Sequence, residues 1–354
     1  MDPRIKQILE YAVMAPSGDN CQPWKFTVND LKVDLYNSPL KDTSLYNLQQ
    51  RASLIAHGAA LENIAIAAPT VGLKADIQFF PKPEDNTHIA SITFSECAKT
   101  EHPLFPAIPK RHTNRENYLP VKISDTQKEQ WLTLPQNNGQ KVWIGTETEE
   151  INKLASLLAY NDRLVFEVPD LHRFLFEQIR WSDNHARETG DGLDIKTLGL
   201  NKIDQFAFKF LKNWGLVALL KHVGFTKIIE LKGKQLLKTS SAIAVLVIPD
   251  TKEPDYVQGG QLWQRLLLQL SSQGLTAQPV AGLAVLLQSA YEGKLEDKIS
   301  TAQKDRLINI RQELLQMTGT NENAVILAMF RIGQGKQVTR ALRRPLETFL
   351  KTEN

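Results

Sequence analysis

The first segment of this chain that could carry chemistry is residues 16–24, Pro-Ser-Gly-Asp-Asn-Cys-Gln-Pro-Trp. Proline fixes φ, while glycine, aspartate and asparagine tolerate tight backbone conformations, so the segment predicts a turn. Ser17, Asp19 and Asn20 place short polar groups beside exposed backbone amides. The residues alone leave two interpretations open: a loop that binds a ligand, or a helix stop followed by a strand whose Trp24 packs in the core.

Two arginine-rich segments could supply an anion site. Arg111, Thr113 and Arg115 alternate along a short stretch, with His112 between the first two. Arginine offers a fork of donors that suits phosphate, and threonine adds a hydroxyl beside a backbone amide. A second group of arginines lies at residues 340–344. Each segment could equally be a solvated basic stretch.

A further candidate is the turn at residues 274–283, Gly-Leu-Thr-Ala-Gln-Pro-Val-Ala-Gly-Leu. Its glycines and proline are typical of a connection between a helix and a strand. The two cysteines, Cys21 and Cys97, give neither a disulfide framework nor the spacing of metal ligands. No convincing Cys-His pair accompanies Cys21. We therefore assign no side-chain nucleophile and no metal site.

These segments together resemble the FMN-dependent nitroreductase superfamily. Residues 16–24 match its Pro-Ser-x-x-Asn-x-Gln-Pro-Trp signature, and residues 111–115 match its Arg-x-Ser/Thr-x-Arg sequence. The turn at 274–283 is similar to the family's Gly-Leu-x-x-x-Pro-x-x-Gly turn, and residues 330–346 are similar to its closing segment. The resemblance covers most of the chain and matches the fused, Acg-type branch of the superfamily.

The resemblance implies a flavin between two lobes. In that family one subunit's Pro-Ser-x-x-Asn loop touches the isoalloxazine ring, and the other subunit grips the phosphate. Flavin N5 then carries the hydride, so no side chain is assigned as catalytic. The residues implied to bind FMN are Pro16, Ser17, Gly18, Asn20, Arg111, His112, Thr113, Arg115, Pro279, Val280, Ala281, Gly282, Arg343 and Arg344.

By the same match, Arg111 and Thr113 would hold the phosphate, with His112 alongside. Arg343 or Arg344 would complete the phosphate clamp, and the sequence does not choose between them.

Arg115 falls where the family places a cation near flavin N1 and O2, where it would stabilise the charge of the reduced ring. A backbone N–H of the turn around Pro279–Gly282 would bond to N5. Ala281 replaces an acidic residue that some members carry, which puts the family's usual substrate geometry in doubt.

The motifs are distributed unequally along the chain. The first half contains the loop at 16–24 but no Arg-x-Ser-x-Arg at its start. The second half contains residues 111–115 and the arginine tail, whereas residues 132–143 do not match the ring-loop signature. A family dimer has two equivalent sites, so the resemblance implies that one site per chain survives here.

The bulk composition indicates an ordinary globular protein. At 354 residues the chain suits two lobes or one large fused fold. A net charge of +3 without a dense basic stripe gives no argument for nucleic acid. The longest apolar run, at 242–249, is far short of a membrane span. We expect a cytoplasmic protein that acts on a small molecule, with no nucleic acid and no membrane partner.

Apolar periodicity predicts the elements that must position the motifs. The segment 182–238, interrupted by several glycines, could be a lid or a helical insertion. Helices are expected at 4–14, 51–71, 125–134, 148–160, 170–182, 256–273 and 297–317, and strands at 24–36 (a hairpin), 75–80, 90–94, 241–248 and 324–332.

A faint internal repeat aligns residues 58–73 with residues 260–275 without gaps. Both are long apolar helices closed by Gly-Leu, the signal of a glycine C-cap. With the split motifs, this favours an α+β fold in which a nitroreductase-like unit is duplicated as a pseudo-dimer, with antiparallel-rich sheets and long central helices. We expect lobes at 1–105 (ring loop) and 106–354 (phosphate clamp), in a monomer that could associate further.

Three functions stay open. The resemblance favours an FMN oxidoreductase in which NAD(P)H reduces the flavin and a nitroaromatic or quinone-like acceptor reoxidises it. The missing second site motivates an alternative, a protein that binds or stores FMN with little turnover. The third, more remote, is an interaction protein without flavin. The sequence does not choose between NADH and NADPH.

Overall fold

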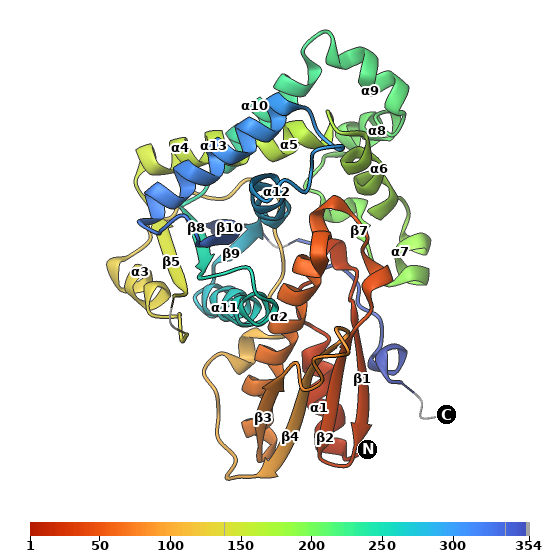
Figure 1. Cartoon of the computed structure of the whole chain (residues 1–354), viewed down its shortest axis with the longest axis vertical. Helices are drawn as coiled ribbons and strands as arrows, with labels where there is room; N and C mark the ends of the chain where they lie inside the picture. The colour runs from red at the N-terminus through yellow and green to blue at the C-terminus, as the bar shows by residue number, and fades with distance from the viewer. Residues whose placement is uncertain (138, 337, 352–354) are drawn as a thin grey trace.

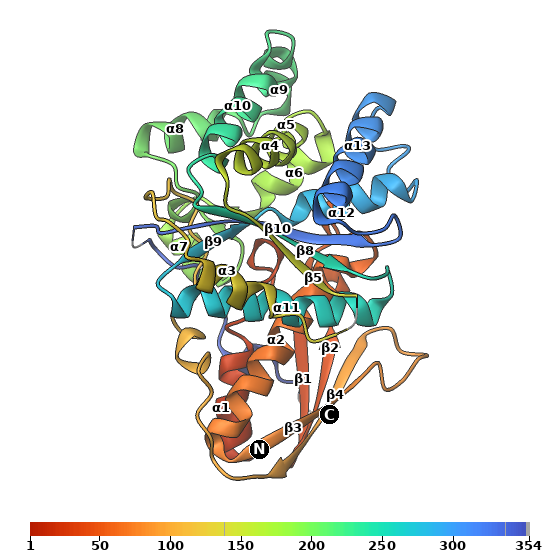
Figure 2. The same ribbon diagram turned by 90° about the vertical axis from the view of Figure 1, so that its left-hand side faces the viewer.

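The computed structural model describes residues 1–137, 139–336 and 338–351. Two four-stranded antiparallel sheets form the framework (Figures 1 and 2). The first has the order β1-β2-β4-β3, and the second has the order β5-β8-β10-β9. Their strands are β1 (Trp24–Asn29), β2 (Lys32–Asn37), β3 (Leu73–Phe79), β4 (His88–Glu96), β5 (Lys141–Gly145), β8 (Ala242–Ile248), β9 (Thr276–Pro279) and β10 (Val325–Gly333).

Burial differs between the sheets. Strands β8 and β10 are buried at every position, whereas the edge strand β3 alternates towards solvent after its first residue. Figure 2 shows the reason: helices cover both faces of the second sheet. A strand covered on both sides reads as a continuous apolar run, such as Ala-Ile-Ala-Val-Leu-Val-Ile in β8.

Helices make up most of the remaining structure, and a short parallel pair, β6 (Ile179–Arg180) with β7 (Leu193–Asp194), lies among them. The helices are α1 (Pro3–Ala12), α2 (Arg51–Ala67), α3 (Asp125–Leu132), α4 (Thr148–Leu158), α5 (Tyr160–Val165), α6 (Pro169–Gln178), α7 (Asp183–Thr189), α8 (Lys202–Phe210), α9 (Trp214–Lys221), α10 (Phe225–Leu237), α11 (Glu253–Ser272), α12 (Ala281–Tyr291) and α13 (Thr301–Thr318).

The duplication expected from the repeat is confirmed by topology. The first half runs α1-β1-β2-α2-β3-β4, and the second runs α3-β5-β8-α11-β9-β10 once its extra helices are set aside. Equivalent strands occupy equivalent places in the two sheets. Helices α4 to α10 are inserted between β5 and β8, and α12 with α13 between β9 and β10. The α+β fold with two long central helices is therefore confirmed.

The central helices α2 and α11 pack against each other as two copies of one surface. A Cβ on Gly58 would overlap the backbone of Val257, and a Cβ on Gly260 would overlap the backbone of Ile55. In the alignment of the repeat, Ile55 corresponds to Val257 and Gly58 to Gly260. The two contacts are thus equivalent by an approximate two-fold symmetry, as in an isologous dimer interface.

Buried polar pairs follow the same rule. Arg265 donates to Glu62 at 2.7 and 2.9 Å, and Gln264 donates to Asn63 at 2.8 Å. In the alignment Glu62 corresponds to Gln264, and Asn63 corresponds to Arg265. The Glu62–Arg265 contact and the Asn63–Gln264 contact are therefore equivalent under the same symmetry.

The chain ends by returning to the first sheet. Leu350 bridges Phe26 of β1, and the ring of Phe349 lies 6.0 Å from that of Trp24. One apolar core contains side chains of both halves. The boundary at 105/106 therefore stays a prediction, because the two lobes share a core and the C-terminal tail of the second packs on the first.

The expected elements are mostly present, with differences in their bounds and with additional short elements, and the helix expected at 170–182 ends at Gln178, where strand β6 follows. The helix expected at 51–71 is α-helical to Ala67 and continues as a 3-10 turn to Val71. Strands β5 and β9 and helix α12 were not expected. The helical stretch Leu45–Val71 is long and apolar enough to cross a membrane, yet 78% of its most apolar window is buried inside the protein. Packing against α11 accounts for that composition.

Candidate functional site

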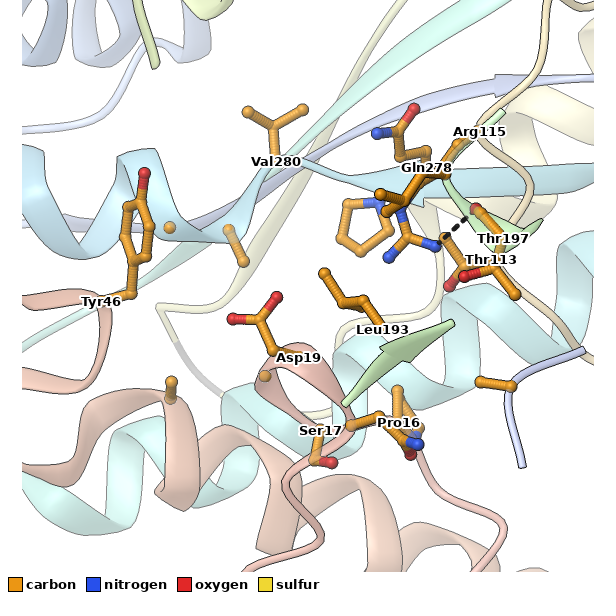
Figure 3. A pocket seen from close by; sticks show the side chains of 18 of the residues that line it. Pro16, Ser17, Asp19, Tyr46, Thr113, Arg115, Leu193, Thr197, Gln278 and Val280 are labelled. Atoms are coloured by element: carbon orange, nitrogen blue, oxygen red, sulfur yellow. Dashed lines mark hydrogen bonds between the residues drawn. The ribbon is translucent and has the colours of Figure 1, made fainter. Parts of the chain in front are cut away.

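A cavity of about 670 Å³ lies between the two halves, within the size range of pockets for small organic ligands. The four segments singled out in the sequence all reach it (Figure 3). The sequence-predicted residues that line it are Pro16, Ser17, Gly18, Asn20, Arg111, His112, Thr113, Arg115, Pro279, Val280, Ala281, Gly282 and Arg343. Arg344 is the one predicted residue that does not line it.

The loop at 16–20 is held in an unusual backbone conformation. Asp19, Asn20 and Gln22 have φ of 41°, 60° and 52°, a left-handed region that residues other than glycine adopt at a cost. Ser17 Oγ accepts a hydrogen bond from the backbone N–H of Gln22 at 3.0 Å. The buried Gln22 amide donates to the carbonyl of Gly190 at 2.8 Å. The loop is thus fixed by its own side chains and by the helical insertion.

Asn20 and the tail are joined by hydrogen bonds. The Asn20 amide donates to the carbonyl of Leu342 at 2.9 Å, and its oxygen accepts a bond from Arg343. The contact of Asn20 with a flavin ring, implied by the resemblance, stays a prediction, since Asn20 lines the cavity. The hydrogen bonds show in addition that its side chain positions the tail, because the tail crosses to the first lobe.

The two tail arginines have different partners. Arg344 pairs with Asp191 and donates to the carbonyl of Thr189 at 2.9 Å. Its backbone N–H donates to Gln22 Oε1 at 3.0 Å. Arg344 therefore ties the loop, the tail and the end of α7 together outside the cavity, whereas its neighbour Arg343 lines the cavity, as does Arg340 of the same tail.

Positive charge gathers at one end of the cavity around Arg111. Its Nε is buried and has no hydrogen-bond partner among the described residues. Burial, with Arg343 and Arg340 nearby, lowers the pKa of Arg111 to about 9. Burial also lowers the pKa of Arg343 to about 10. A buried donor among like charges is the electrostatic signature of a site for an anion.

Arg115 and Asp19 lie on opposite walls. Arg115 Nη1 donates to the carbonyl of Thr197 at 3.3 Å, which Figure 3 shows as a dashed line. Burial raises the pKa of Asp19 to about 6, with Asp42 adding to the increase and Arg115 opposing it. Arg115 and Asp19 both line the cavity and are close enough for the charge of each to shift the pKa of the other. Asp19 belongs to the loop identified in the sequence but was not assigned a role there.

The turn between β9 and α12 forms another wall. Thr113 bridges Ala277 of β9, which fixes the arginine segment against the second sheet. The N–H of Val280 donates to the carbonyl of Met329 at 2.8 Å, so it is used within the fold. The first amides of α12, from Ala281 onward, have no acceptor within the helix, and no side chain caps them. They are the donors of this turn that remain for a ligand.

Close packing requires glycine at the start of α12. A Cβ on Gly282 would overlap the ring of Tyr46, which comes from the first half. The Tyr46 hydroxyl donates to Asn161 Oδ1 at 3.1 Å. Next to it, burial raises the pKa of Asp162 to about 6. Tyr46, Asn161 and Asp162 line the cavity, and they belong to no motif by which they could have been identified from the sequence.

Arg331 on β10 also lines the cavity, and it was not among the site residues predicted from the sequence. It is fully buried, donates to Gln278 Oε1 at 2.6 Å and to the carbonyl of Glu116 at 2.7 Å, and stacks 4.0 Å from the ring of Tyr118. Its hydrogen bond holds the side chain of Gln278, which also lines the cavity, in place. The only signal was an arginine within an apolar strand, Phe-Arg-Ile-Gly.

The segment 182–238, left open between a lid and an insertion, contains helices α7 to α10. It is part of the helical insertion between β5 and β8, and it also forms a large part of the cavity wall. Its lining residues are Leu193, Thr197, Leu198, Ile229, Gly233, Leu236 and Leu237.

No protein-family model matches the chain. A protein of Mycobacterium tuberculosis named "Uncharacterized protein MT1398" is 23% identical over 332 residues, 93% of this chain and 46% of that protein. "Putative NAD(P)H nitroreductase acg" of the same species is 38% identical over 93 residues, 26% of this chain and 28% of that protein. "Putative NAD(P)H nitroreductase MT3217" is 30% identical over 116 residues, 32% of this chain and 34% of that protein.

These relatives confirm the resemblance to the Acg-type branch of the nitroreductase superfamily that the motifs indicated. The matched region spans less than half the length of each of them.

Solved structures overlap the chain only partly. The "FMN and NADPH-dependent nitroreductase NfnB from sphigopyxis sp. strain HMH" is 13% identical and covers 71% of this chain and 99% of its own, with a TM-score of 0.39. A nitroreductase with bound FMN from Desulfitobacterium hafniense is 12% identical and covers 72% of this chain and 100% of its own, with a TM-score of 0.38.

Proposed function

We propose that the cavity binds one FMN and that the chain is an NAD(P)H-dependent oxidoreductase that reduces a small nitroaromatic or quinone-like acceptor. One observation carries the proposal: Arg111, whose Nε is buried and has no partner among the described residues, lies with Arg343 at one end of a cavity whose other walls are the loop at 16–20 and the start of α12. An FMN would fit this arrangement with its phosphate beside the arginines and its planar ring between the loop at 16–20 and the start of α12.

Each lining segment has a role in this proposal. Arg111, Thr113 and Arg343 would hold the phosphate, with His112 beside them. Arg115 would lie near the ring, where its charge would stabilise negative charge that develops on reduction. Bound FMN would supply the hydride-accepting atom, N5. The loop at 16–20 and the first amides of α12 would orient the ring.

The proposal includes a single flavin site per chain, and the symmetry of the central helices supports it. Ala56 and Ala59 of α2 line the cavity. In the repeat they correspond to Gln258 and Gln261 of α11, whose larger side chains would take up the equivalent space. The chain also lacks a ring-loop signature at 132–143. Because both halves are in one chain, a monomer would suffice for the site.

The first experiment is an absorption spectrum of the purified protein together with mass spectrometry of the released ligand. We expect an oxidised-flavin spectrum and one FMN per chain. The protein is then mixed anaerobically with NADH or NADPH and afterwards with a panel of quinones and nitroaromatics. Bleaching of the flavin followed by its reoxidation supports the oxidoreductase. Protein that takes up no flavin even after incubation with FMN would contradict the whole proposal.

The alternative, binding or storage of FMN with little turnover, is favoured by one feature. Leu193, Thr197 and Leu198 of the helical insertion line the cavity, where they would restrict the access of a nicotinamide to a bound flavin ring. In this case FMN would bind, yet neither NADH nor NADPH would reduce it. The anaerobic experiment therefore separates the two roles directly.

A further inference from the structure

The helical arm, residues 202–238 with helices α8, α9 and α10, exposes an unusual number of large apolar side chains. Seven of the thirteen large apolar residues exposed in the described chain belong to it, with 54% to 80% of each exposed. Figures 1 and 2 show the arm at the end of the molecule opposite the first sheet. The seven residues are Ile203, Phe206, Phe210, Leu219, Val223, Ile228 and Leu231.

Helix α8 shows the pattern most clearly. Ile203, Phe206 and Phe210 recur at helical spacing and so share a face, and the rings of Phe206 and Phe210 lie 5.2 Å apart. No residue of α8 is buried. An amphipathic helix ordinarily turns its apolar stripe towards the core. Here the stripe faces outward, which indicates that something outside the chain covers it.

The arm also concentrates positive charge. It contains eight lysines and no arginine, against only Asp204 and Glu230, which gives a net charge of +6. The whole chain has a net charge of +3, so the remainder is negative. None of the eight lysines forms an ion pair with the described residues. Glu230, by contrast, is paired with Arg163. The arm therefore offers uncompensated positive charge next to exposed apolar groups.

Helix α10 connects this surface with the cavity. Its inner face carries Ile229, Gly233 and Leu236, which line the cavity. Its outer face carries Ile228 and Leu231, with Lys227 and Lys232 beside them. A partner bound to the outer face would thus lie one helix away from the cavity.

We propose that the arm docks on the anionic surface of a phospholipid bilayer. Lysines beside protruding Phe, Leu and Ile are the composition of helices that lie in the interface, with apolar groups among the acyl chains and cations at the headgroups. A second copy of the chain is disfavoured by charge, because a two-fold contact through the arm would oppose lysine to lysine. The absence of a long apolar run predicted no membrane partner, but it concerns only segments that span a bilayer, and interfacial binding needs none.

Vesicle sedimentation with the full chain tests the proposal. Vesicles contain either phosphatidylcholine alone or phosphatidylcholine with about 30% phosphatidylserine. We expect partitioning onto the anionic vesicles to be about tenfold stronger or more, and to fall as salt is raised. Equal binding to both kinds of vesicle, or binding to neither, overturns the proposal.

Two arm variants and a matched control locate the contact. Lys227→Glu/Lys232→Glu and Phe206→Ser/Phe210→Ser change exposed residues and should each reduce partitioning about tenfold. Lys74→Glu/Lys82→Glu makes the same charge change on exposed lysines of the first half, and partitioning should stay within about twofold of wild type.

Arm variants that sediment like wild type would contradict the proposal. So would self-association that these variants abolish without any vesicle binding. Neither readout depends on flavin, so failure here leaves the proposed function untouched.

Discussion

The two central helices have the same ancestry in the fold but different surroundings. Where α2 and α11 meet, the symmetry is preserved in detail, since Gly58 and Gly260 each receive the backbone of the other helix. Away from that contact the copies diverge: Ala56 and Ala59 of α2 border the cavity, whereas their counterparts on α11 are Gln258 and Gln261. The comparison indicates that the residues where the two copies pack together have diverged less than the residues that face the cavity in only one of them.

The largest effect should come from breaking the symmetric contact. Arg265→Met leaves Glu62 buried without its cation, and we expect a loss of about 3–5 kcal/mol in the free energy of unfolding, measured by urea denaturation. The double variant Glu62→Met/Arg265→Met should recover most of that loss, because it removes both charges. If the single variant were as stable as wild type, the contact would not be the feature that holds the halves together.

Exchanging the residue types that differ between α2 and α11 tests the proposal of a single flavin site. Ala59→Gln puts the α11 residue type into the cavity wall, and FMN affinity should fall about tenfold or more, equivalent to about 1.4 kcal/mol. Gln261→Ala is the reverse change and should leave FMN affinity unchanged. Isothermal titration of flavin-free protein measures both. Normal FMN binding by Ala59→Gln would show that the small side chain is not required.

A smaller, pH-dependent effect concerns Asp19. Its pKa of about 6 lies above its ordinary value of 3.8, so the folded protein binds this proton more tightly than the unfolded chain. Asp19 therefore contributes stability at about pH 4 that is lost as the pH rises through 6. Asp19→Asn should be more stable than wild type at pH 7.5 by about 1–2 kcal/mol, and the difference should vanish near pH 4.

The control for this profile is Asp76→Asn, an exposed residue of β3. It should show no gain that depends on pH. Parallel unfolding profiles for wild type and Asp19→Asn between pH 4 and 7.5 would contradict the assignment of a protonated Asp19.

The sequence was informative where a residue type has few structural uses. The turns at 16–20 and 274–283 and the arginines at 111–115 were singled out by residue type and spacing, and all three segments line one cavity. The alignment of residues 58–73 with 260–275 predicted the duplication. The hairpin and the buried strands β8 and β10 followed from apolar patterning alone.

The rest depended on contacts between distant segments. Arg344 and Arg343 are adjacent and chemically identical, and only the position of Asp191 separates their roles. Asp162 reaches the cavity because the helical insertion folds over it, and Tyr46 reaches it because the segment before α2 packs against Gly282 at the start of α12. Strand β9 has four residues and a proline, too short for a periodic signal, and is specified by its pairing with β10.

The central claim is that segments from opposite ends of the chain form one flavin site. The most direct test is the FMN dissociation constant of Arg111→Ala/Arg343→Ala, with the exposed Arg187→Ala as control. Loss of two cations facing one phosphate should weaken binding about a hundredfold, or about 3 kcal/mol, while the control binds like wild type. An unchanged dissociation constant in the double variant would contradict the account.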